Sequence, residues 1–364
     1  MLIHALTIEQ LRLFDRVVLE PGQGINLLVG DNGAGKTSVL EAIHVLSSGR
    51  SFRGSIRDAL IRRGDTELRV FAEIFSETDQ RQVRLGLSRS LRGWNARLDG
   101  APVDLLSRLF QELAVVCFEP GSHALVSGGS EHRRRFIDWA LFHVEPSFIA
   151  PWRRYQRALK QRNALLKQQS DAISLSPWEQ ELAQHGATLS RMREDWLAGF
   201  EPVLARMAER FLPELGEVQL KYAPGWSDES HADGLATALA ASRGRDLALG
   251  HTSLGPHRAD WSIGFAQAPV REMFSRGQEK LVVLACLLAQ AQAFSLARGQ
   301  WPVLLLDDLP SELDADHLAA TLAWLAETPA QAFISGTAGL LLPESGERET
   351  RMFHVEQGRI GRLL

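Results

Sequence analysis

One short segment of the chain carries the residue types that bind a polyphosphate. The segment Gly30-Asp31-Asn32-Gly33-Ala34-Gly35-Lys36-Thr37 fits the phosphate-loop pattern G-x-x-x-x-G-K-[ST]. The apolar run 25–29 precedes it and a helical run over 39–46 follows it, so the segment joins a predicted strand to a predicted helix. In this setting, backbone N–H groups and the positive end of the helix point at phosphate oxygens. The predicted nucleotide-binding residues are Gly30, Asp31, Asn32, Gly33, Ala34, Gly35, Lys36, Thr37 and Ser38.

Two side chains of this loop have chemistry of their own. Lys36 can reach the β- and γ-phosphates of a nucleoside triphosphate as a point charge, and the Thr37 hydroxyl is placed to coordinate Mg²⁺. The alternative is a glycine-rich turn that binds nothing, and we disfavour it because the full pattern lies between a strand and a helix. ATP and Mg²⁺ are therefore the predicted cofactors, although the loop alone does not define a function.

A second motif is an apolar run that ends in two carboxylates. Residues 302–308 read Pro-Val-Leu-Leu-Leu-Asp-Asp, a pattern typical of a parallel strand that is covered on both faces. Ligands of such sheets bind at the carboxyl ends of the strands, so the carboxylates are expected to face the nucleotide. We predict that Asp307 holds Mg²⁺ and that Asp308 positions or deprotonates the attacking water. Asp308 and Lys36 are thus the predicted catalytic residues. Alone the pattern is common by chance, and the phosphate loop makes it specific.

A third motif precedes the apolar helical run over 281–294. Ser275 and Gln278 have the S-x-x-Q spacing of a capping box, so one interpretation is simply a well-capped helix start. A serine hydroxyl and the Gly277 amide at a helix N-terminus are also groups that a second subunit can present to a γ-phosphate. Both interpretations can hold together.

A fourth motif, Ser311-Glu312-Leu313-Asp314, follows three residues after the two carboxylates. Its structural interpretation is an N-cap for a helix over 312–326. Its functional interpretation is a nucleotide contact made to a second subunit. The predicted contacts of this kind are Ser275, Gly277, Gln278 and Asp314.

Composition limits the classes of protein to consider. A chain of 364 residues with 45% hydrophobic content suggests two to three well-cored domains. Its net charge is −4, so any contact with nucleic acid must come from a local basic patch. Cys117 and Cys286 lie in apolar surroundings and read as buried thiols of a reducing compartment. The start of the chain does not resemble a leader, and the longest apolar run, Leu281 to Ala289, is too short for a membrane span. We expect a cytoplasmic protein without a membrane partner.

The order of the elements predicts an α/β fold class: an ABC-type phosphate-loop ATPase head with an antiparallel β layer, plus an inserted helical lobe. Residues 2–30 read as two or three short strands, and 68–103 as an antiparallel sheet with a hairpin at Asp99-Gly100. Two helices are predicted within 178–212, punctuated by Pro202 and Pro213. The predicted domains are 1–118 (N-terminal half of the head), 119–249 (helical lobe) and 250–364 (C-terminal half of the head).

Local clusters of arginine and lysine are the candidate DNA contacts. The helix predicted over 152–169 carries six cations and no acidic residue, although a solvated charged face is the ordinary explanation of such a run. The basic segment 49–63 can reach a γ-phosphate or a DNA backbone, or it can be a solvated connector. The candidate DNA contacts are Arg53, Arg133, Arg134, Arg153, Arg154, Arg157 and Lys160.

Several segments of the chain match the signatures of one known family. They are Pro120-x-x-x-x-Leu125-Val126-x-Gly128-Gly129, Arg133-Arg134-Arg135-Phe136-Ile137-Asp138, Thr252-Ser253-Leu254-Gly255-Pro256-His257-Arg258, and Leu306-Asp307-Asp308-x-x-Ser311-Glu312-Leu313-Asp314-x-x-His317.

With these segments the chain resembles the RecF family, in the SMC-like branch of the ABC-type ATPases, over nearly its whole length. The resemblance implies an ATP-dependent DNA-binding protein of recombinational repair and replication. ATP would close two heads on single-strand/double-strand junctions at gaps, and slow hydrolysis would release them. The enzyme implied is a weak, DNA-stimulated ATPase that acts as a switch. The implied partner is RecR, with RecO, and the implied outcome is RecA loading.

Three other classes remain to be weighed against this one. For the ATPase subunit of a transporter, the segment Ser275-Arg276-Gly277-Gln278 lacks the double glycine of that signature. Thr337 also stands where such proteins carry a switch histidine after a strand. A phosphate-loop kinase would not need Ser275 or Asp314. A long SMC protein would need a longer separation than that from Lys36 to Asp307.

Overall fold

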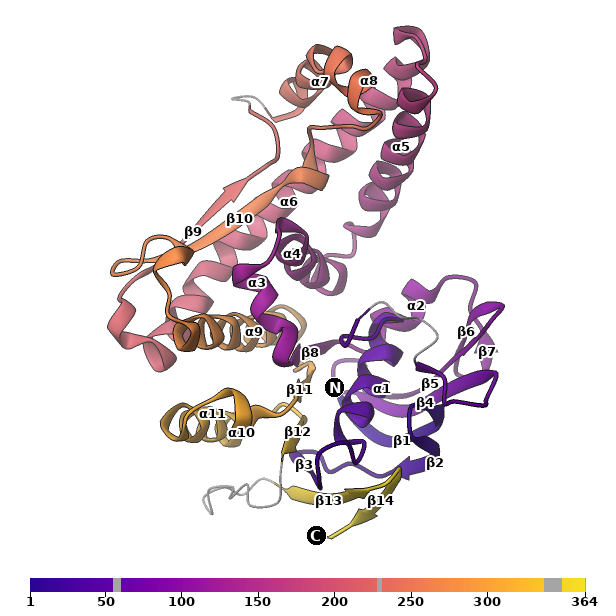
Figure 1. The fold of residues 1–364 in the computed structure, drawn as a ribbon, viewed down its shortest axis with the longest axis vertical. Helices are drawn as coiled ribbons and strands as arrows, with labels where there is room; N and C mark the ends of the chain where they lie inside the picture. The colour runs from indigo at the N-terminus through magenta and orange to yellow at the C-terminus, as the bar shows by residue number, and fades with distance from the viewer. Residues whose placement is uncertain (55–59, 228–230, 337–348, 364) are drawn as a thin grey trace. The chain divides into compact units, whose positions relative to one another are not determined.

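The computed structural model describes residues 1–54, 60–227, 231–336 and 349–363. The chain divides into two compact units (Figure 1). The first unit comprises residues 1–123 and 280–364, and the second comprises residues 124–279. The two parts of the first unit are therefore separated in sequence by the whole of the second.

The first unit contains a six-stranded antiparallel sheet in the order β2-β1-β4-β5-β6-β7. Side chains alternate between buried and exposed along β4, as expected for a sheet with one face on the core. The prediction of this sheet and of its hairpin at Asp99-Gly100 is confirmed. Its strands are β1 (Leu2–Leu11), β2 (Phe14–Leu19), β4 (Glu67–Ser76), β5 (Arg81–Ser90), β6 (Gly93–Leu98) and β7 (Ala101–Pro102).

The second sheet of this unit has the order β14-β13-β3-β12-β11-β8. The neighbours β13, β3, β12, β11 and β8 run parallel, so their carboxyl ends meet at one edge. All residues of β3, β11 and β12 are buried, which explains why the sequence reads as continuous apolar runs. The strands are β3 (Ile25–Val29), β8 (Val115–Phe118), β11 (Val303–Leu306), β12 (Ala332–Gly336), β13 (Thr350–Glu356) and β14 (Arg359–Arg362).

The helix α1, which follows the phosphate loop, contacts strands of both sheets and is buried at ten of its thirteen residues. Gly49 ends this helix in the left-handed conformation that favours glycine. The helices of the first unit are α1 (Lys36–Ser48), α2 (Leu106–Gln111), α10 (Leu309–Glu312) and α11 (Ala315–Glu327), and α9 (Arg276–Arg298) begins in the second unit and continues in the first.

The second unit is mainly helical. Its helices α5 and α6 pack along each other, and α4 contacts α6. The strands β9 and β10 form an antiparallel pair that contacts α6 and α4. The elements are α3 (Ala124–Ser127), α4 (Ser130–Val144), α5 (Ile149–Lys167), α6 (Ala172–Phe211), β9 (Val218–Ala223), α7 (His231–Ala241), α8 (Arg243–Leu249) and β10 (Asp260–Phe265).

The prediction of two helices within 178–212 is wrong. α6 is one helix of 40 residues, and both Pro177 and Pro202 lie inside it. An interior proline removes one backbone hydrogen bond and costs about 3 kcal/mol. Phe200, Val203 and Leu204 are buried on both sides of Pro202, so the apolar face continues through it and its packing offsets that cost.

The predicted boundary at residue 250 is also wrong. β10 pairs along its whole length with β9, so residues 250–279 belong to the second unit and the first unit resumes at Lys280. The apolar strand pattern over 261–265 could not show which partner the strand would choose. The predicted boundary at 119 lies within five residues of the observed one.

Three smaller expectations concern burial and the missing switch histidine. Of the two cysteines expected to be buried, Cys286 is buried, which raises the pKa of its thiol to about 12, whereas Cys117 is only partly buried. Among the described residues, α9 alone is long and apolar enough to cross a membrane by length and composition, and 61% of its apolar window is buried in the structure. Thr337 lies outside the described residues.

A buried ion-pair network joins the helices of the second unit. Arg162 of α5 is 0% exposed, and its guanidinium donates to Asp246 at 2.7 Å and to Glu179 at 3.1 Å. The same group donates to Thr252 Oγ1 at 2.9 Å. Arg162 is one of the six cations that the sequence places on this helix, and the structure shows that it is a core residue.

We expect Arg162→Leu to lower the free energy of unfolding of the second unit by about 3–5 kcal/mol, because it leaves the buried Asp246 without the cation paired with it and leaves Glu179 with Arg243 alone. Urea unfolding of the full chain, followed by tryptophan fluorescence, measures the loss. Arg154→Leu on the exposed side of the same helix is the matched control and should change stability by less than about 0.5 kcal/mol. A loss of equal size in both variants would contradict the role of the network.

Candidate functional site

The phosphate loop lies between β3 and α1, as predicted. Gly30 (φ 152°) and Gly35 (φ 118°) adopt backbone conformations that other residues rarely adopt. A side chain at Gly30 would also meet the carbonyl oxygen of Val355 at 2.1 Å, so β13 leaves no room for one. The loop is therefore fixed by the strand beside it as well as by its own turn.

Lys36 folds back over this loop. Its Nζ donates to the carbonyl oxygens of Gly30 at 2.7 Å and Asp31 at 2.9 Å, and the residue is 8% exposed. Both acceptors are neutral carbonyl oxygens, and among the described residues no carboxylate forms an ion pair with this ammonium group. An anion that enters the loop can therefore take over the same ammonium group without breaking an ion pair.

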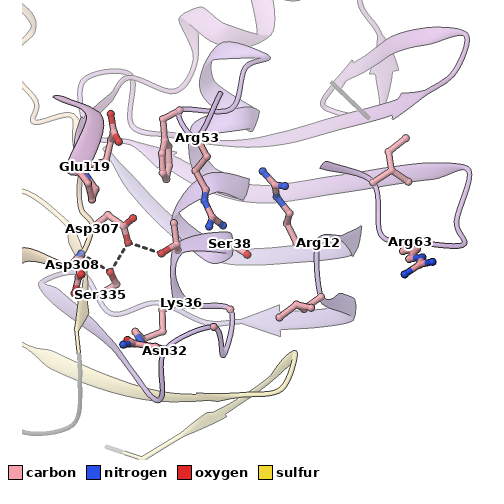
Figure 2. A pocket seen from close by; sticks show the side chains of 17 residues that line it. Arg12, Asn32, Lys36, Ser38, Arg53, Arg63, Glu119, Asp307, Asp308 and Ser335 are labelled. Atoms are coloured by element: carbon pink, nitrogen blue, oxygen red, sulfur yellow. Dashed lines mark hydrogen bonds between the residues drawn. The ribbon is translucent and has the colours of Figure 1, made fainter. Parts of the chain in front are cut away.

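The carboxylate of Asp307 is bound to the phosphate loop through Thr37. Thr37 Oγ1 donates to Asp307 Oδ1 at 2.9 Å, and Ser335 Oγ donates to the same oxygen at 2.6 Å (Figure 2). Burial raises the pKa of Asp307, and the two hydroxyls oppose that shift. Mg²⁺ prefers oxygen ligands and binds through one or two carboxylates together with phosphates, so Thr37 and Asp307 fit it.

Asp308 adopts the left-handed conformation, with φ 52° and ψ 36°. Its backbone N–H donates to Ser335 Oγ at 2.8 Å, and its carboxylate accepts from Ser311 Oγ at 2.9 Å. Aspartate tolerates this conformation better than most residues. The turn directs the second carboxylate away from the first, while one serine hydroxyl, that of Ser335, connects both residues.

A cavity of about 830 Å³ opens beside these groups and is lined entirely by the first unit (Figure 2). It brings together the phosphate loop, the two carboxylates and Arg53, one of the candidate DNA contacts. Sequence reasoning assigned no role in the site to several of its lining residues. These are Arg12, Leu13, Phe52, Glu119, Pro120 and Ser335.

Glu119 and Arg12 are the most informative of the residues that sequence reasoning missed. Burial raises the pKa of Glu119, and the nearby charge of Asp307 adds to this shift. Arg12 makes two hydrogen bonds, at 2.8 and 2.7 Å, to Glu41, which is fully buried on α1. Glu41 also accepts from Ser51, next to the cavity residues Phe52 and Arg53. No spacing in the sequence connects these residues, because their contacts span separate elements.

The segment that precedes α9 forms the predicted capping box. Gln278 N donates to Ser275 Oγ at 3.2 Å, and Ser275 N donates to Gln278 Oε1 at 3.0 Å. A side chain at Gly277 would meet nothing closer than 4.0 Å, so packing within the chain does not require this glycine. Asp314 caps α11, where it accepts from His317 N at 2.9 Å, so that helix begins later than predicted.

The candidate DNA contacts separate into two groups. Arg133 is 9% exposed and is engaged by Asp260 and by the carbonyl oxygens of 125, 126 and 128, so its prediction as a DNA contact is wrong. Arg134 donates to Ser130 Oγ and Ala259 O and also holds the fold. On α5, the exposed candidates are Arg153, Arg154, Arg157 and Lys160.

Known proteins of one family resemble this chain over nearly its whole length. Residues 2–360 match the family described as the RecF/RecN/SMC N-terminal domain. The chain is 49% identical to the DNA replication and repair protein RecF of Stenotrophomonas maltophilia, over 99% of both chains. It is 50% identical to RecF of Xanthomonas axonopodis pv. citri, over 98% of this chain and 97% of the relative. Identity to RecF of Shewanella denitrificans is 36%, over 99% of both chains.

Solved structures show the same fold. The recombination mediator protein RecF with ATP matches at a TM-score of 0.89 and 24% identity, over 100% of this chain and 97% of that one. An Smc head bound to the C-terminal winged-helix domain of ScpA matches at a TM-score of 0.62 and 14% identity, over 100% and 98%. The predicted ABC-type ATPase head is confirmed as the fold.

Ser335 provides a test of the site. We expect Ser335→Ala to raise the Mg²⁺ concentration that gives half-maximal ATP binding by about 10-fold or more. The reason is that a hydrogen bond to a charged group is worth about 1.5–3 kcal/mol. Calorimetric titration of ATP at several Mg²⁺ concentrations measures this change. Ser311→Ala is the control, because among the described residues its hydroxyl donates to the Asp308 carboxylate and not to Asp307, so the Mg²⁺ dependence should stay unchanged. An unaltered Mg²⁺ half-saturation in Ser335→Ala would exclude this role.

Proposed function

The chain belongs to the RecF family of DNA replication and repair proteins, and we propose that it is an ATP-dependent DNA-binding protein whose two copies close on DNA when ATP is bound. The observation that carries this proposal is the cavity in which Lys36, Thr37, Asp307 and Asp308 meet. The structural relative with ATP supports the choice of nucleotide.

The loop and its lysine bind the triphosphate in this proposal. Backbone N–H groups of residues 30–37 surround the phosphates, and the N-terminus of α1 adds its partial positive charge. Lys36 transfers its hydrogen bonds from the two loop carbonyls to the β- and γ-phosphates. Thr37 and Asp307 would hold Mg²⁺, which supplies charge neutralisation to the phosphates when bound.

Hydrolysis depends on Asp308. Its carboxylate accepts a proton from the attacking water as the water oxygen bonds to the γ-phosphorus and the bond from that phosphorus to the β–γ bridging oxygen breaks. The products are ADP and inorganic phosphate, and the proton passes to solvent. Asp308 is one methylene shorter than glutamate and is held by Ser311, so the proposed turnover is slow. The enzyme then acts as a weak, DNA-stimulated ATPase and a switch.

A second copy completes the site. Ser275, Gly277 and Gln278 present a helix N-terminus, and Asp314 presents a carboxylate, to the γ-phosphate side of the partner's cavity. The open space at Gly277 supports this, because a close approach by another molecule explains a glycine that the fold does not need.

The DNA surface is proposed to include the exposed cations of α5. Phosphate contacts of this kind are independent of sequence and sensitive to salt. We further propose single-strand/double-strand junctions at gaps as the DNA, RecR as the partner, and RecA loading together with RecO as the outcome, in the cytoplasm. Family membership supports these proposals.

The closed state is tested by Asp308→Asn, which keeps the size of the side chain and tolerates the left-handed backbone but removes the base. We expect it to bind ATP, to hydrolyse ATP about 10² to 10⁴ times more slowly, and to accumulate as a dimer on DNA. Sedimentation with ATP and gapped DNA, alongside phosphate release, measures both effects.

Lys36→Met is the control for that experiment. It removes the cation proposed to bind the γ-phosphate and should therefore prevent the ATP-dependent association of two copies. A parental hydrolysis rate in Asp308→Asn would remove Asp308 from its role. An ATP-dependent dimer of Lys36→Met would contradict the assignment of the loop.

The contact between two copies is tested by Ser275→Arg. The monomer should bind ATP with nearly parental affinity, since its own loop is unchanged, while ATP-dependent dimerisation is lost. Nucleotide binding by calorimetry and sedimentation with ATP separate the two effects. Ala297→Arg at the exposed far end of α9 is the control and should dimerise normally. Loss of monomer binding in Ser275→Arg would contradict a contact made to the second copy.

A further inference from the structure

The hairpin of β5 and β6 has a composition that the ATP site does not explain. Residues 81–98 contain five arginines and no acidic residue, on a chain of net charge −4. Arg81 is paired with Glu112 at 2.6 Å. In the part of the chain that the structure describes, the other four make no ion pair; they are Arg84, Arg89, Arg92 and Arg97.

The turn of this hairpin exposes a leucine. Leu91 is 86% exposed, more than any other large apolar side chain of the described residues. It stands in the two-residue turn between Ser90 and Gly93, where polar residues and glycine are usual. The turn is fixed, because Arg92 N donates to Ser90 Oγ at 3.2 Å and Gly93 has φ 123°. The turn therefore presents an apolar side chain at the tip of a basic hairpin.

The strands behind the tip present cations on both faces. Arg89 lies over the ring of Trp94 at 5.0 Å, which holds its guanidinium in place near the turn. Arg97 stands opposite Gly86 on the other face, diagonally next to Arg84. From Arg84 to Ser90 the strand β5 extends roughly 20 Å at 3.4 Å per residue. The hairpin is thus a basic ribbon that ends in an exposed apolar side chain.

We propose that the β5–β6 hairpin is a binding site for duplex DNA, in which the arginines contact phosphates and Leu91 inserts against a base step. This inference rests on the proposed function and adds a surface in the first unit to the α5 surface of the second. Proteins that kink duplexes combine arginines with an inserted apolar wedge in this way. A single strand fits less well, because it needs a free aromatic face for stacking and Arg89 covers the face of Trp94.

Arg92→Gln and Leu91→Ser separate the two parts of this site. Duplex binding by the full chain with ATP, measured by fluorescence anisotropy over a salt series, is the test. Arg92→Gln should lower the salt slope by about 1, because one phosphate contact is lost. Leu91→Ser should weaken binding about 10-fold without a change of slope, because it removes apolar burial but no charge. A duplex with 2-aminopurine should brighten with the parental protein and less with Leu91→Ser.

The hairpin of β13 and β14 supplies a matched control in the same unit. Arg359→Gln combined with Leu363→Ser also removes one exposed cation and one exposed leucine and should leave duplex binding unchanged. ATP turnover without DNA should stay parental in all variants, because the β5–β6 hairpin does not line the ATP cavity. The hairpin site alone would be overturned by either of two results. One is parental affinity for duplex DNA in the double variant Leu91→Ser/Arg92→Gln, and the other is an equal loss of duplex affinity in the control. A parental protein that binds no duplex with ATP would overturn the hairpin site and the proposed function together.

Discussion

The burial of one carboxylate is the constraint on which the site depends. Asp307 ends a strand whose residues are all buried, and it is itself 4% exposed, so its charge has lost most of its water. Hydroxyls from α1 and from β12 offset that loss, at 2.9 and 2.6 Å. Those two bonds require the loop helix, β11 and β12 to keep their register, and that register is set by the parallel sheet. The positions of the side chains in the site are therefore set by the edge of the parallel sheet.

Local patterns in the sequence predicted the parts of the site that one segment can specify by itself. The phosphate loop, the strand that ends in Asp307 and Asp308, and the capping box of Ser275 all depend on neighbours within a few residues. Ser335 and Glu119 were missed because each acts through elements distant in sequence. The break predicted at Pro202 failed for a related reason, since tertiary packing of the apolar face outweighs a local preference.

Charge was the least reliable signal, because a sequence shows how many cations a segment has but not where their partners lie. Arg133 and Arg162 stand in basic runs, and both are buried against carboxylates from other elements. Buried ion pairs of this kind contribute little net stability but penalise the loss of either partner. In the arginine-rich run 133–135, two residues hold the fold: Arg133 through Asp260, and Arg134 through Ser130 and Ala259. A motif match in such a run can thus reflect packing, and we regard two sets of cations as better candidates for nucleic acid: the exposed ones of α5, and the four hairpin arginines that make no ion pair among the described residues.

The hydrogen bonds around Asp308 bear on the long-lived ATP state proposed above. The residue sits in the left-handed region, its N–H is used by Ser335, and its carboxylate is used by Ser311. The Ser311 hydroxyl occupies the carboxylate oxygen Oδ1 of Asp308. To activate water this oxygen must share or release Ser311, which belongs to the same turn and leads into the cap of α11. In the proposed mechanism, slow turnover would depend on hydrogen bonds within one short segment, and the ATP contacts proposed for Lys36 and Thr37 do not involve those bonds. The proposed switch thus assigns nucleotide binding and hydrolysis to separate groups of one site, so that the rate of hydrolysis can change without a change in nucleotide affinity.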